Sequence, residues 1–212
     1  MTLETKVGSR ESRGFIRKAM SLGFNLAAAG MTTALSVGLI GTTGVITGTG
    51  LGLGYLAGKL IKGNSFYDSL NEGLKAYSAF NAVIAPNFWF SDATYPMIPI
   101  KTLAGKIARS IYALTAYNAV FVSSYNAAYH LIQNKLNPKG IIKGTFGNFY
   151  NDSNRIRNVY APGWIANALE ISPFGLSPFS FNSPIAGLYN SIKPIPKKEA
   201  APMYISPYAA AA

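Results

Sequence analysis

The sequence predicts a mainly α-helical protein with a membrane-inserted helical hairpin, one or two further long helices, and an extended C-terminal arm rich in proline and aromatic residues. Three observations support this fold class. Residues 19–58 carry no charged side chain, which is enough chain for two membrane crossings, because one crossing takes about 20 mainly apolar residues. Only 13% of the 212 residues are charged, with 19 Lys and Arg against 8 Asp and Glu, a balance that suits a membrane protein whose charges flank its spans. Nine of the 12 prolines lie from Pro138 onward.

Positively charged residues flank the uncharged run on both sides, and the predicted membrane flanks are Arg17, Lys18, Lys59 and Lys62. Positive flanks favour the cytoplasmic or interior face. Two flanks on one face fit a hairpin, because a single span would place them on opposite faces. We therefore expect a basic N-terminal arm over residues 1–18 and an apolar, glycine-rich hairpin over residues 19–62, with its turn near residues 38–44. Each arm has about 18 residues, which allows either a complete crossing or partial insertion.

The second half of this hairpin carries two rows of glycines at four-residue spacing: Gly44, Gly48 and Gly52, and Gly50, Gly54 and Gly58. On a helix such rows form smooth ridges that let another backbone approach closely. We expect these residues to mediate helix packing and oligomerisation. The same glycines partly match the G-x-G-x-x-G loop of dinucleotide-binding proteins, but the third glycine is missing and no βαβ pattern surrounds them, so no nucleotide site is predicted.

Residues 63–137 form the predicted helical region. Ser65 and Asp68 match a capping box at the start of a helix, and Pro86 is expected to end that helix. Residues 86–100 contain three prolines and several aromatic residues, so we expect a membrane-interface segment or a packed aromatic loop. Helical periodicity returns over residues 101–134.

The uncharged run over residues 110–134 has two interpretations. It is either a third membrane helix whose polar side chains face a bundle or pore, or a long helix packed outside lipid. His130, the single histidine, is either a functional ionisable group at membrane depth or an ordinary interfacial or buried histidine.

Residues 138–212 are expected to form an extended arm that wraps neighbouring subunits, with a short helix starting at Pro162. A repeated Ile/Leu-Ser-Pro-aromatic motif supplies the expected arm contacts, which are Phe174, Phe179 and Tyr208. Prolines in this motif favour extended backbone at the residues before them.

The sequence predicts a protein without enzymatic activity, because the single histidine has no flanking motif, no G-x-S-x-G occurs and no nucleophile-base arrangement is visible. The absence of cysteine excludes disulfides, thiolate metal sites and cysteine nucleophiles, and one histidine excludes a site with several histidine ligands from one chain. No catalytic, metal-binding or cofactor-binding residue is predicted. Nucleic acid is a possible partner, since Arg155 and Arg157 alternate with apolar and aromatic residues, but it is not favoured because the basic residues are otherwise spread along the chain.

The whole chain resembles membrane-associated virion proteins of archaeal spindle-shaped viruses, in particular their tail-adaptor proteins. The resemblance is carried by the hairpin segment ITGTGLGLGYLAG, the Asn/Tyr-rich segment SIYALTAYNAVFVSSYNAAYH, the arm segment ISPFGLSPFSF and the absence of cysteine. It implies a homo-oligomeric ring or adaptor, located in a virion membrane, whose partners are lipid, further copies of itself and other structural proteins. The alternative is a membrane channel or holin-like pore lined by polar residues of the 110–134 run.

Overall fold

The computed structural model describes residues 3–168, which are mainly helical and contain no strand, as the sequence predicts. The helices follow one another in the order α1 (Leu3–Ile40), α2 (Thr43–Ile61), α3 (Phe66–Thr94), α4 (Leu103–Tyr112), α5 (Asn118–Gln133), α6 (Ile141–Phe146) and α7 (Phe149–Ala168). A short 3₁₀ turn (Tyr95–Met97) follows α3, and a π-helical turn (Ala113–Tyr117) joins α4 to α5 into one long helical rod. The helix expected over residues 101–134 is therefore present.

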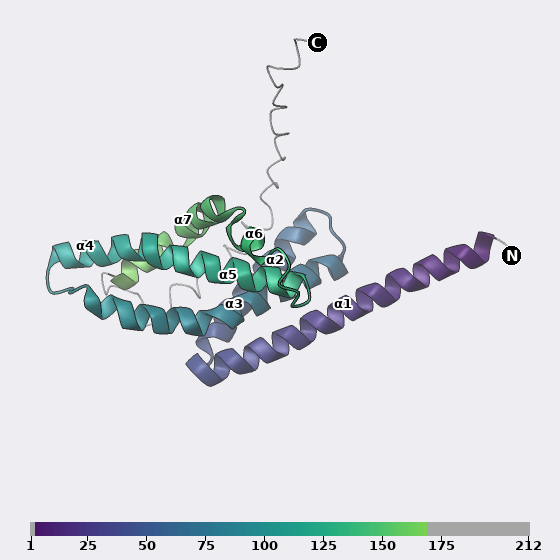
Figure 1. Ribbon diagram of the computed structural model, residues 1–212, viewed down its shortest axis with the longest axis horizontal. Coiled ribbons are helices and arrows are strands. Elements are labelled where there is room, and N and C mark those ends of the chain that lie inside the picture. The colour runs from purple at the N-terminus through teal and green to yellow at the C-terminus, as the bar shows by residue number, and fades with distance from the viewer. Residues whose placement is uncertain (1–2, 169–212) are drawn as a thin grey trace, which may run out of the picture.

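Helices α1 and α2 form a hairpin whose turn lies at Gly41 and Thr42, inside the range that the sequence predicts. The backbone of Gly41 is left-handed, with φ +68°, and its N–H bonds to the carbonyl oxygen of Val37 at 3.0 Å. Glycine adopts this conformation without a steric cost and commonly ends a helix in this way. Because α1 begins at Leu3, the basic N-terminal segment continues directly into the first arm of the hairpin, and its first turns extend past the other helices (Figure 1).

Helix α3 is the central element of the bundle. It packs against α1, α2 and α5, running parallel to α1 and antiparallel to α2 (Figure 1). Its buried residues Phe80 and Ile84 meet Phe121 and Val122 of α5 in the apolar core. The rings of Phe80 and Phe121 lie edge to face, with their centroids 6.1 Å apart, a favourable arrangement for aromatic pairs.

The expectation that a helix ends at Pro86 is wrong, since α3 continues through this residue to Thr94. A proline inside a helix removes one backbone hydrogen bond and crowds the preceding turn. The carbonyl that loses its donor is that of Ala82, and beside it the Asn87 side chain donates to the carbonyl oxygen of Val83 at 2.8 Å, which ties down the same turn. Burial of Ile84, Ala85 and Asn87 holds the segment in helical geometry.

The expectation of an extended arm from residue 138 is corrected for the described part of that segment, which forms α6 and α7 and packs on α5. Residues 139–161 contain no proline, and Ile156 is buried against the core, so this stretch gains more from packing as a helix than from an extended conformation. Helix α7 also passes through Pro162, where the sequence predicts a helix start. The expected contacts Phe174, Phe179 and Tyr208 lie outside the described residues.

Candidate functional site

The first glycine row of α2 lies against α3 of the same chain. A Cβ atom added to Gly48 would collide with the side chain of Asn81, and one added to Gly44 would meet Ile84 at 3.0 Å and also collide with Ser36 of α1. The closest backbone approach is reciprocal: a Cβ on Gly52 would lie 3.0 Å from the carbonyl oxygen of Gly73, and a Cβ on Gly73 would lie 2.7 Å from that of Gly52. These glycines thus let α2 approach α3 of the same chain closely.

The glycines of the second row are also largely covered by the rest of the chain. Gly54 and Gly58 are buried and Gly50 is half-buried. Assembly between subunits through either row stays a prediction.

Polar side chains join α1 to α3 inside the bundle. The Nδ2 of Asn25 donates to Oδ1 of Asn71 at 3.0 Å, and both residues are buried. About two helical turns further along, the hydroxyls of Thr33 and Tyr77 lie 2.5 Å apart. A buried amide pair is costly unless both members are satisfied, so these contacts fix the register of α1 on α3.

The polar residues of the 110–134 run also bond to neighbouring helices. Ser124 accepts from Nδ2 of Asn87 on α3 at 2.9 Å. Asn118 donates to Oγ of Ser153 at 2.7 Å, and Asn126 donates to Asp152 of α7 at 3.0 Å. These side chains therefore serve as contacts between α5 and its neighbours.

His130 lies near the end of α5, where its Nε2 is 3.0 Å from the carbonyl oxygen of Lys139. The amide of Asn134 also contacts the imidazole nitrogens. The ring thus ties the α5–α6 connection to the end of α5, which matches the ordinary interfacial histidine among the two interpretations.

The outer face of α1 is apolar. Its exposed large side chains are Phe15, Ile16, Met20, Leu26, Met31, Leu35, Val37 and Leu39. Among the described residues, one helical segment is long and apolar enough to cross a membrane, namely residues 14–40 of α1. Only 22% of its most apolar window is buried within the structure, whereas the core helix of a water-soluble protein would be mostly covered.

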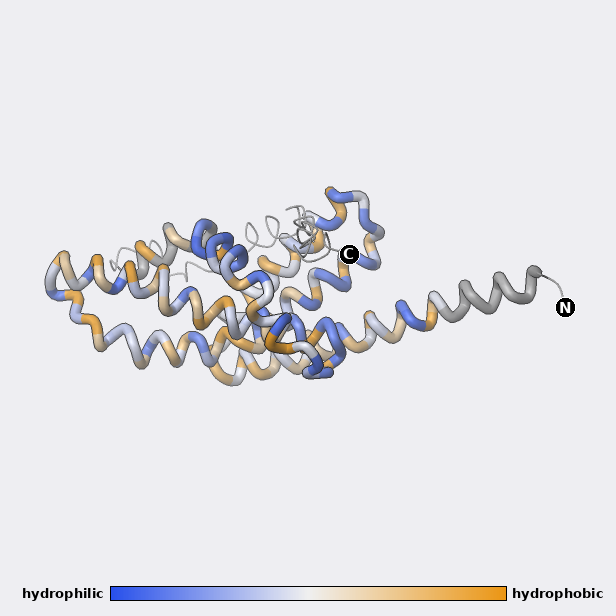
Figure 2. The backbone as a smooth tube through the Cα atoms, turned by 45° about the horizontal axis from the view of Figure 1, so that its top comes forward, coloured by the Kyte–Doolittle hydropathy of each residue, from blue (hydrophilic) through white to orange (hydrophobic). Residues whose placement is uncertain are grey.

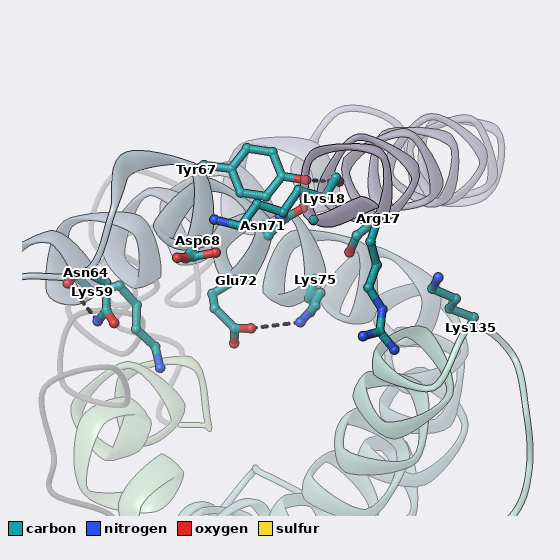
Figure 3. A pocket seen from close by; sticks show the side chains of 12 residues that line it. Arg17, Lys18, Lys59, Asn64, Tyr67, Asp68, Asn71, Glu72, Lys75 and Lys135 are labelled. Carbon is teal, nitrogen blue, oxygen red and sulfur yellow. Dashed lines mark hydrogen bonds and ion pairs between the residues drawn. The ribbon is translucent and has the colours of Figure 1, made fainter. Parts of the chain in front are cut away.

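A cavity of about 680 Å³ lies at the end of the bundle where α1 enters it, between α1, the end of α2 and the start of α3. Figure 2 shows that the connection between α2 and α3 is hydrophilic. The charged residues that line the cavity are Arg17, Lys18, Lys59, Asp68, Glu72, Lys75 and Lys135 (Figure 3). Three of the predicted membrane flanks, Arg17, Lys18 and Lys59, are thus brought together at one end of the hairpin, while Lys62 follows α2 and does not line the cavity.

Glu72 is the most constrained charge in this cavity. Its Oε1 pairs with Nζ of Lys75 at 2.7 Å, and its Oε2 accepts a hydrogen bond from the hydroxyl of Tyr129 at 2.7 Å. Burial alone would raise the pKa of Glu72, but the hydrogen bonds from Lys75 and Tyr129 and the charges of Lys75 and Lys59 outweigh it and hold the pKa below its ordinary value. Glu72 is therefore a stable anion at neutral pH.

The basic pair Arg155 and Arg157, considered for nucleic acid, is engaged inside the chain. Arg155 forms an ion pair with Asp152 at 2.7 Å, and Arg157 donates to the side chain of Asn154. Within residues 3–168, no cluster of three or more acidic or histidine side chains is arranged to hold a metal ion.

Sequence reasoning did not anticipate Asn71, Lys75 and Lys135 as members of a site. Lys75 and Lys135 lie 60 residues apart in the chain, and only the packing of α5 beside α3 brings them to one cavity. No pattern in the sequence singles out Asn71, whose amide becomes buried against Asn25 only when α1 packs on α3.

Comparisons with protein-family models, curated proteins and solved structures return no match for this chain.

Proposed function

We propose that this chain is a non-enzymatic structural membrane protein whose α1–α2 hairpin inserts into lipid, with α3 and α5 completing a helical bundle. The observation that carries the proposal is the placement of polar side chains between the helices and of large apolar side chains on the outside. Asparagine and serine side chains bond to one another between helices, and Thr33 bonds to Tyr77, while large apolar side chains of α1 and α2 point away from the bundle. Helices in lipid use small residues and interhelical hydrogen bonds in this manner, because apolar contact alone gives no preference for protein over lipid.

The charges near the hairpin fit the same proposal. Arg17, Lys18 and Lys59 lie together at one end, where they would contact lipid headgroups. Glu72 and Lys75 of α3 neutralise each other, which is the usual state of ionisable groups close to a membrane interior.

The narrower form of the proposal is a homo-oligomeric ring or adaptor in a virion or a similar lipid-containing assembly. It is motivated by the resemblance described for the sequence. One structural feature supports self-association through α1: exposed small residues recur along its outer face, at Gly23, Ala27, Gly30, Ala34 and Gly38. No side chain of the described residues lies within 4 Å of a Cβ position at Gly23, Gly30 or Gly38, so a second helix has room to approach.

The alternative, a channel or holin-like pore, draws on the polar residues of the 110–134 run. Asn118, Ser124 and Asn126 bond to partners on α3 and α7 of the same chain, which leaves them poorly suited to line a water-filled path. The scaffold is therefore the function that we favour.

Membrane insertion is tested by expressing the chain in cells and asking whether it resists alkaline extraction and floats with vesicles. Leu26 and Met31, which are 53% and 63% exposed, are replaced together by Lys. Each lysine near the middle of a membrane helix costs about 2.5–3.5 kcal/mol, so the double variant should leave the membrane fraction. The matched control replaces Ile142 and Phe146 of α6 by Lys. These two side chains are 75% and 57% exposed and lie beside Lys143, so the control should stay in the membrane. Equal behaviour of the two variants would refute insertion through α1.

The mass of the detergent-extracted complex tests the oligomer. Replacement of Gly30 by Ile should reduce that mass if α1 joins subunits, and an unchanged monomeric mass for the unmodified chain would refute self-association. Ion flux through the protein in liposomes tests the pore: sustained conductance would overturn the scaffold in favour of the channel.

A further inference from the structure

The cavity at the entry of α1 into the bundle carries an excess of positive charge. Five cationic side chains line it, Arg17, Lys18, Lys59, Lys75 and Lys135, against the two carboxylates Asp68 and Glu72. We propose that this cavity binds a phosphate-bearing anion, such as the phosphate of an anionic lipid headgroup or of a small soluble phosphate ester.

The two carboxylates in the cavity are already engaged. Glu72 pairs with Lys75 and accepts from Tyr129. Asp68 accepts a hydrogen bond from the hydroxyl of Ser65 at 2.7 Å, in the capping arrangement that starts α3. These contacts leave little capacity to neutralise the other cations of the lining.

Among the described residues, three cations from separate parts of the fold form no ion pair of their own, although the charge of Lys59 also acts on Glu72. In the part of the chain that the structure describes, Arg17 of α1, Lys59 of α2 and Lys135 after α5 make no ion pair with a carboxylate. Like charges held around one cavity repel each other, and a bound anion converts that repulsion into attraction. A phosphate group has several acceptor oxygens, so it can accept from donors that line different walls of one cavity.

The lining adds neutral polar groups that would complete such a site. Asn64, Asn71 and Ser21 lie on the wall of the cavity, and Figure 3 shows the side chains of Arg17, Lys59 and Lys135 around the Glu72–Lys75 pair. Tyr67 forms another part of the wall, where the Lys18 ammonium lies 5.7 Å from the centre of its ring and its hydroxyl donates to the Lys18 carbonyl oxygen. The volume of about 680 Å³ is that of a site for a small organic molecule and exceeds what a bare ion needs.

The cavity also lies at the level where a headgroup would be found. Its α1 lining runs from Gly14 to Ser21 and includes Lys18, the last charged residue before the uncharged run of α1. The lipid form of this inference rests on the proposed membrane insertion, whereas binding of a soluble phosphate ester does not.

The test uses the full chain purified in a neutral detergent. The cavity variant carries Arg17→Gln, Lys59→Gln and Lys135→Gln. The control carries Lys101→Gln, Lys139→Gln and Lys143→Gln, which remove the same charge at exposed positions outside the cavity. A single Lys135→Gln change, at an exposed connection, serves if the triple variant is misfolded by circular dichroism.

In the soluble arm, glycerol 3-phosphate and inorganic phosphate are titrated by calorimetry. In the lipid arm, mass spectrometry of the intact protein counts phosphatidylglycerol retained from mixed micelles, with phosphatidylcholine as the neutral competitor. We expect binding in at least one arm, weakened about tenfold or more in the cavity variant and unchanged in the control, because each lost contact is a charge-assisted hydrogen bond. Binding in the lipid arm alone identifies a headgroup site, and binding in the soluble arm identifies a phosphate ester site.

Equal losses in the cavity and control variants would overturn the proposal, because they would show attraction to net charge alone. Absence of binding in both arms would also overturn it, as would tight binding of a single-stranded oligonucleotide with no response to either phosphate probe. Membrane insertion is measured separately by flotation, so failure of the phosphate site is distinguishable from failure of the proposed function.

Discussion

The close crossing of α2 and α3 at Gly52 and Gly73 predicts how much a methyl group added there would lower the free energy of unfolding. In Gly73→Ala the new Cβ would lie 2.7 Å from the carbonyl oxygen of Gly52, about 0.7 Å inside ordinary van der Waals contact. The obstacle is backbone, which cannot rotate away as a side chain does, so the two helices must separate. Overpacking of this kind costs about 1–3 kcal/mol, and we expect Gly73→Ala to destabilise the fold by that amount. Gly52→Ala, with its contact at 3.0 Å, should cost somewhat less.

The assay is denaturant unfolding in detergent, followed by the helical circular dichroism signal. Gly14→Ala is the control, because no atom outside its own helix backbone lies within 4 Å of its Cβ position and alanine favours a helix over glycine by about 0.5–1 kcal/mol. The double variant of Gly52 and Gly73 should lose less than the sum of the single losses, because one separation of the helices accommodates both methyl groups. The loss should not depend on protein concentration, since the contact lies within one chain. A Gly73→Ala variant as stable as the control would refute the close crossing, and a loss that grows on dilution would transfer the contact to a subunit interface.

Three further predictions use polar contacts. Asn71→Leu should cost about 1–3 kcal/mol because it leaves the buried amide of Asn25 without a partner, and Asn25→Leu added to it should recover part of that loss in the same unfolding assay. The pKa of Glu72 lies below its ordinary value of 4.5, so the ionised carboxylate stabilises the fold above that pH and this stabilisation is lost as the pH falls below it. The melting temperature of Glu72→Gln should therefore fall less steeply than that of the unmodified chain between about pH 6 and about pH 3. Arg109 donates to the carbonyl oxygens of Tyr95 and Ile98 at 3.0 and 2.9 Å, so Arg109→Ala should speed amide hydrogen exchange in residues 95–102, and unchanged exchange would contradict that role.

The hairpin was predictable because its evidence is local and strong. The uncharged run, its flanking charges and the glycines near residue 41 all lie in one continuous stretch. The partner of the first glycine row was not predictable, because a four-residue glycine row looks the same whichever helix packs on it. A usable signal did exist in Gly73, the single glycine of α3, which is the natural counterpart of a glycine ridge.

The errors at Pro86 and in the C-terminal region share one cause. Both interpretations treated proline as a local boundary, whereas a helix that is held by packing tolerates one proline when nearby side chains support the perturbed turn. Asn87 gives that support in α3, and the donor is visible in the sequence only after the helix is known. The cationic cavity was half predictable: the flanks Arg17, Lys18 and Lys59 were expected on one side, but Lys135 joins them only through the tertiary packing of α5.

The two faces of α1 explain how one helix can serve both the bundle and its surroundings. Its inward stripe consists of Asn25, Ala28, Ala29, Thr33 and Ser36, all of which are buried or bonded to the rest of the chain. Its outward face mixes small residues with long apolar ones and carries no charge from Ala19 to the turn. Water would solvate such a face poorly, whereas lipid or a second copy of α1 would cover it. Asn25 and Thr33 of the inward stripe fix α1 to α3 through hydrogen bonds. The outward face can therefore contact either lipid or a second copy of α1 while the bundle stays intact.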